Sequence, residues 1–127
     1  MSKSFSSNGY VKVSELIDPN TIKTVSQYFE NKINRGEWTS DSADSKDSSK
    51  FGYYADPLIE VILVSARDKI EKQTGLSLDP TYSYSRVYQG GEELLPHTDR
   101  PSCEISATIN VACTGEPWPI WMQYEGN

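Results

Sequence analysis

Two Asp-Pro pairs, at positions 18–19 and 56–57, each precede a stretch in which apolar residues recur at helical spacing. Aspartate is a favoured N-cap residue because its carboxylate accepts hydrogen bonds from free backbone N–H groups, and proline is favoured at the first helical position. Each apolar stretch is also followed by a glycine, the residue that most often ends a helix. The pattern therefore predicts helices over about 19–34 and 57–74.

After Pro80 the apolar spacing changes from that of helices to that of strands. Polar and apolar residues alternate along 82–88 and again along 104–111, with shorter alternating stretches at 10–13 and from 120 to 124. Helices followed by successive short strands predict an α+β protein with an antiparallel sheet or barrel.

The length and charge of the chain limit its organisation and its partners. With 127 residues it is expected to form a single domain over 1–127. Its net charge of -6 argues against binding to nucleic acid or to an anionic membrane surface. It contains no run of about 18 apolar residues, and its first residues lack the apolar core of a signal peptide. We therefore expect a cytoplasmic protein with neither nucleic acid nor membrane as a partner.

The single histidine of the chain, His97, is followed two positions later by Asp99. On an extended strand these two side chains would point to the same face and converge. A neutral imidazole and a carboxylate are two of the three ligands that hold non-haem Fe(II) in 2-His-1-carboxylate sites. The pair also occurs by chance, so a surface histidine beside a solvated aspartate is the alternative interpretation. Pro96 and Pro101 bracket the pair and restrict its backbone.

A longer pattern surrounds this pair: Arg-x-Tyr at 86–88, a glycine pair at 90–91, His-x-Asp-Arg at 97–100 and Cys-Glu at 103–104. With this pattern the segment 84–111 resembles Fe(II)/2-oxoglutarate-dependent oxygenases of the prolyl 4-hydroxylase-like superfamily, in particular the bacterial and phage type. The likeness is specific over roughly residues 80 to 124 and loose over the rest of the chain.

The resemblance implies two N-terminal helices packed on an antiparallel double-stranded β-helix of the jelly-roll or cupin kind. It implies His97 and Asp99 as metal ligands, and Tyr88, nine residues before His97, as a hydroxyl donor to 2-oxoglutarate. Arg100 is the candidate cation for a carboxylate of this cosubstrate, with Arg86 as the other basic residue near by. The implied cofactors are Fe(II), 2-oxoglutarate with O₂, and ascorbate. The implied substrate is a peptide or a small molecule, and assembly into an oligomer is compatible with the sequence.

Two elements of the family pattern have no counterpart in this sequence, and both lie on later strands in the family. They are the second iron-binding histidine and the Arg or Lys that binds the far carboxylate of 2-oxoglutarate. The C-terminal strands of the β-helix would thus be missing from this chain. Three explanations stay open: a piece of a longer gene product, a second chain that completes the barrel, or a remnant without the chemistry. We expect these 127 residues alone to be inactive, and a longer product with the second histidine to be a dioxygenase. The alternative function is a non-catalytic binding or interaction module.

Overall fold

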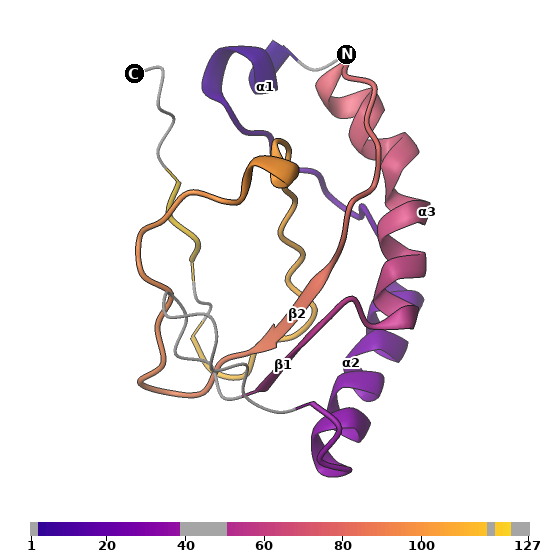
Figure 1. Cartoon of the computed structure of the whole chain (residues 1–127), viewed down its shortest axis with the longest axis vertical. Helices are drawn as coiled ribbons and strands as arrows, with labels where there is room; N and C mark the ends of the chain where they lie inside the picture. Colours follow the sequence, from indigo (N-terminus) through magenta and orange to yellow (C-terminus); the bar gives the residue numbers. More distant parts are fainter. Residues whose placement is uncertain (1–2, 39–50, 117–118, 123–127) are drawn as a thin grey trace.

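The computed structural model describes residues 3–38, 51–116 and 119–122. The elements in these residues, in chain order, are α1 (Lys3–Asn8), α2 (Pro19–Asn34), β1 (Phe51–Tyr54), α3 (Pro57–Thr74), β2 (Tyr84–Val87) and the 3₁₀ turn η1 (Pro101–Cys103). Helices α2 and α3 lie on one side of the two strands, and the chain after β2 loops out on the opposite side (Figure 1). The predicted α+β class is confirmed.

Both long helices begin and end where the sequence predicts. Asp18 accepts hydrogen bonds from two backbone N–H groups of the first turn of α2, at 3.0 and 3.3 Å. Asp56 does the same for α3, at 3.0 and 3.4 Å. Helix α3 ends at Gly75, whose φ of 77° is left-handed and therefore suits glycine. Local capping chemistry is enough to define these two elements.

The two strands form an antiparallel sheet in which Phe51 faces Val87 and Tyr54 faces Tyr84. Strand β2 lies within the stretch 82–88 that the alternation predicts, whereas β1 was not predicted because four residues are too short a pattern. Gly52 of β1 is buried against β2: a Cβ at this position would lie 2.9 Å from the carbonyl oxygen of Ser85. The close approach of the two strands thus requires glycine here.

We expect Gly52→Ala to lower the free energy of unfolding by about 1–3 kcal/mol, because the added methyl group pushes the paired backbones apart. The control is Gly90→Ala, where nothing lies within 4 Å of the new Cβ. Replacing glycine by alanine also reduces the conformational entropy of the unfolded chain, which stabilises the protein. Both variants share this effect, so it cancels when their free energies of unfolding are compared. Urea unfolding measures the difference, and equal midpoints for the two variants would contradict the close approach.

Trp38, just after α2, is the largest fully buried side chain of the described residues, at 1% exposure. Its ring packs edge-on against Phe29 of α2, with centroids 4.6 Å apart, and edge-on against Tyr28 at 6.0 Å. On the other side it stacks with Tyr53 of β1 at 6.3 Å. This aromatic cluster joins α2 to the sheet.

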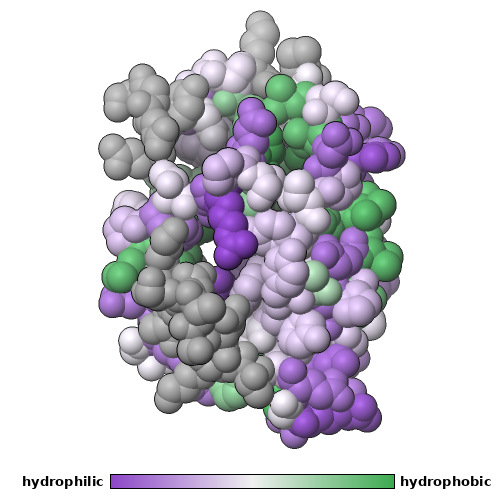
Figure 2. All heavy atoms as spheres, in the orientation of Figure 1, coloured by the Kyte–Doolittle hydropathy of each residue, from purple (hydrophilic) through white to green (hydrophobic). Residues whose placement is uncertain are grey.

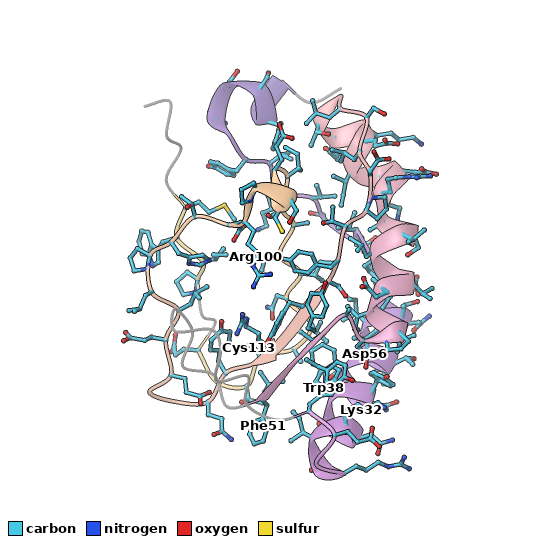
Figure 3. The ribbon with its side chains drawn as sticks, viewed as in Figure 1. Lys32, Trp38, Phe51, Asp56, Arg100 and Cys113 are labelled. Atoms are coloured by element: carbon cyan, nitrogen blue, oxygen red, sulfur yellow. The ribbon has the colours of Figure 1, made fainter. Side chains whose placement is uncertain are left out.

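The first turn of α3 is linked to α2 by a hydrogen bond at the edge of this cluster. The Tyr28 hydroxyl donates to the carboxylate of Asp56, 2.9 Å from Oδ2 and 3.0 Å from Oδ1. Asp56 is only 2% exposed, and Figure 3 shows it beside Trp38. Burial, followed by the hydrogen bond to Asp56, raises the pKa of the Tyr28 hydroxyl. One carboxylate therefore caps α3 and connects it to α2.

The N-terminal part differs from the prediction in two ways. The strand predicted at 10–13 is wrong: these residues connect α1 to α2 without strand pairing. Val11 and Val13 are half-buried and Lys12 between them is exposed, so the alternation reflects burial of one side of the segment. A strand also needs a partner strand, and this segment has none among the described residues. Helix α1, a third helix beside the two expected, was missed because its six residues contain a single apolar side chain, Phe5.

The strand predicted at 104–111 is also wrong, because these residues lack strand pairing in the described structure. The same holds for 120–122, where Trp121 is 90% exposed, while 123–124 of that predicted strand lie outside the described residues. The sheet of the described residues therefore has two strands.

Apolar side chains also reach the surface of α3, where Val61 is 65% and Val64 57% exposed. Figure 2 shows apolar groups along the edge of the molecule at which α3 lies. Within the described part of the chain, no helix combines the length and the apolar character needed to cross a membrane.

Candidate metal centre

His97 and Asp99 lie in the loop that leads from the turn at Gly90 and Gly91 to η1. The strand predicted for His97 is wrong, because residues 97–100 have no strand pairing in the structure. Their backbone is nevertheless held: Arg100 is extended (φ -61°, ψ 152°), and its carbonyl accepts the Cys103 N–H at 2.8 Å as η1 begins.

The two side chains converge, as the sequence predicts. Nε2 of His97 lies 3.4 Å from Oδ1 of Asp99. The His97 side chain is 24% exposed and that of Asp99 49%, so solvent reaches both side chains. If His97 and Asp99 were two unrelated surface side chains, nothing would require Nε2 and Oδ1 to lie this close together.

The other ring nitrogen of His97 determines what the pair can bind. Nδ1 lies 2.8 Å from the carbonyl oxygen of Leu95. Because a carbonyl only accepts hydrogen bonds, we assign the proton of the neutral ring to Nδ1. Nε2 then presents a lone pair to a carboxylate oxygen, and this arrangement is favourable only with a proton or a cation between them. Metal-binding histidines commonly donate their second N–H to a carbonyl or a carboxylate in this way.

The second oxygen of Asp99 is also held. The Ser106 hydroxyl lies 2.7 Å from Oδ2 of Asp99 and 3.3 Å from the carbonyl oxygen of Cys103. The sequence did not single out Ser106 as a site residue. The sequence shows only that Ser106 is one of the polar residues of the alternating stretch 104–111. The fold of the loop brings it back to Asp99.

Tyr82 and Arg100 lie close to the pair. The Tyr82 hydroxyl hydrogen-bonds with the Cys103 thiol, and this bond, followed by burial, raises the pKa of Tyr82, whereas the charge of Arg100 lowers it. Figure 3 shows Arg100 pointing from the start of η1 toward the interior of the loop. Arg100 can therefore supply positive charge near Asp99.

The remaining predicted residues lie on or beside β2. Tyr88 directly follows β2 and is half-buried. The guanidinium of Arg86 lies over the ring of Tyr84, 4.1 Å from its centroid. Asp99 and Arg100 are among the charged groups around Tyr82, which lies six residues before Tyr88.

The donor set fits a divalent transition metal such as Fe(II), for which imidazole and carboxylate are usual ligands. Two atoms bound to one metal ion at about 2.1 Å lie roughly 3 Å apart, close to the separation seen here. Among the described residues, no group of three or more His, Cys, Asp or Glu side chains is placed to hold a metal ion. The described part of the site thus offers two candidate ligands, His97 and Asp99.

Comparisons of the chain with protein-family models, with curated proteins and with solved structures found no match. The functional assignment therefore rests on the residues and their geometry.

Proposed function

We propose that this chain carries the His-x-Asp half of an iron site in a non-haem dioxygenase. The reaction couples decarboxylation of 2-oxoglutarate to hydroxylation of a C–H bond in a peptide or a small molecule. The observation that carries the proposal is the approach of His97 Nε2 to Asp99 Oδ1 at 3.4 Å, with Nδ1 directed at the Leu95 carbonyl.

In this proposal the chain binds and orients, and the metal performs the oxidation. His97 and Asp99 hold Fe(II) as neutral imidazole and carboxylate, and the bound iron supplies the one-electron and O₂ chemistry. Arg100 attracts a carboxylate of 2-oxoglutarate to the same region, and Tyr88 donates a hydroxyl hydrogen bond to it. Ascorbate is the further cofactor, and the cytoplasm is the proposed location.

The proposed complete fold is the double-stranded β-helix, closed by strands that pair with the chain after β2. Support comes from apolar side chains that are exposed in this part of the molecule, among them Leu95 at 46%, Ile109 at 37% and Met122 at 62%. Exposed apolar residues of this kind are typical of a surface that further protein covers. A longer gene product or a second chain would provide that cover.

A second candidate function is a binding module without catalysis. Trp121, at 90% exposure, favours it, because exposed tryptophans are frequent anchors of protein interfaces. Trp118 lies outside the described residues.

Equilibrium dialysis of Fe(II) against the chain under anaerobic conditions tests the metal site. We expect the chain to bind one ion weakly, and the affinity to fall more than about 100-fold in His97→Ala and in Asp99→Ala. Removing a residue that orients a ligand lowers metal affinity about 10–100-fold, and removing the ligand itself should lower it further. The control is Asp68→Ala, which removes a carboxylate whose side chain is 81% exposed. Binding that is equal in His97→Ala and the native chain would contradict the iron site and favour the binding module.

Succinate formation from 2-oxoglutarate tests the reaction itself. We expect none from the 127-residue chain and iron-dependent turnover from a longer product that supplies the second histidine. Turnover by the chain alone, lost in Asp99→Ala, would instead show that another subunit supplies the missing ligand. A longer product that binds iron at His97 without turnover would contradict the dioxygenase reaction.

A further inference from the structure

Ser106 is joined to the candidate metal centre by the geometry of the loop. It lies seven residues after Asp99, and η1 folds the chain so that the two side chains meet. The serine hydroxyl has one proton and two acceptors within reach, and the carboxylate is the closer, at 2.7 Å against 3.3 Å for the Cys103 carbonyl. The charged acceptor also forms the stronger bond. The proton is therefore directed at Oδ2 of Asp99.

This bond determines which oxygen of Asp99 faces His97. With Oδ2 engaged by Ser106, Oδ1 is the atom directed at Nε2. The Asp99 side chain is half-exposed, so burial does not prevent its rotation. Without the serine hydroxyl, the carboxylate would turn between solvent and the imidazole. The bond thus reduces the rotational freedom that metal binding would otherwise have to remove.

We propose that Ser106 is a positioning residue for the metal centre: its hydroxyl holds the Asp99 carboxylate in the orientation that binds the ion, as the Leu95 carbonyl holds the His97 ring. The inference rests on the proposed iron site and extends it by one residue. Partners that orient metal ligands in this way typically contribute 10–100-fold to metal affinity.

The test is a titration of the chain with Mn(II), followed by the EPR signal of the free ion. Mn(II) accepts the same nitrogen and oxygen donors and avoids the oxidation of Fe(II). We expect Ser106→Ala to bind Mn(II) about 10–100-fold more weakly than the native chain. Ser106→Thr keeps the hydroxyl and is expected to restore most of the affinity. The matched control is Ser102→Ala, an exposed serine of η1, which should bind like the native chain.

Urea unfolding of the same variants separates positioning from folding. Ser106 is exposed, so its removal should change the free energy of unfolding by no more than about 0.5 kcal/mol. If Ser106→Ala binds Mn(II) as tightly as the native chain while His97→Ala does not bind, the role of Ser106 is wrong and the metal site stands. If the native chain shows no His97-dependent binding, both proposals are wrong. Equal weakening in Ser106→Ala and Ser106→Thr would also overturn the role of the hydroxyl.

Discussion

Trp38→Ala is expected to lower the free energy of unfolding by about 3–5 kcal/mol, the usual cost of deleting a large buried side chain. The indole is 1% exposed and packs on Phe29 of α2 on one side and on Tyr53 of β1 on the other. Its removal leaves a cavity between the helix and the sheet that neither can close without moving. Since small domains are stable by about 5–15 kcal/mol, this loss would remove a large share of the stability of the protein.

Trp121→Ala provides the matched control, because it removes the same side chain from a site that is 90% exposed. We expect a change within about 0.5 kcal/mol for this variant. Trp38→Phe retains most of the apolar volume and should lie between the two. The measurement is urea unfolding followed by far-UV circular dichroism, which does not depend on tryptophan emission. Equal costs for the two alanine variants would contradict the central position of Trp38.

Asp56→Ala is expected to cost about 2–4 kcal/mol, which is more than an N-cap alone contributes. Loss of an N-cap costs about 0.5–2 kcal/mol, and leaving the Tyr28 hydroxyl without its acceptor adds about 1–3 kcal/mol. Asp18→Ala removes the same cap from α2, but Asp18 is exposed, so this variant should cost only about 1 kcal/mol. The two Asp-Pro sites thus form an internal comparison within one chain.

A double-mutant cycle isolates the contribution of the tyrosine. Tyr28→Phe removes the hydroxyl that donates to Asp56, and the cycle with Asp56→Ala measures their coupling. We expect Asp56→Ala to cost less in the Tyr28→Phe background than in the native chain. Tyr28→Phe combined with Asp18→Ala should be additive, since Asp18 bonds only to its own helix in the contacts described. Additivity of Tyr28 with Asp56 would mean that the two groups contribute independently.

The bounds of α2 and α3 follow from the sequence alone because their determinants are local. Asp18 and Asp56 cap N–H groups two and three residues away, and Gly75 ends α3 through its own φ angle. The approach of His97 to Asp99 was predictable for the same reason, because two residues in an extended stretch share one side even without a paired strand.

The tertiary structure alone decided the features that depend on distant partners. The stretches 10–13 and 104–111 have strand-like alternation, yet neither is paired, because a strand forms only where another strand meets its N–H and C=O groups. Strand β1 carries little pattern and forms because β2 lies beside it. Ser106 reaches Asp99 through the fold of the loop. Capping and spacing act within a few residues and can be read from the chain, whereas strand pairing and the orientation of Asp99 depend on contacts that only the folded backbone creates.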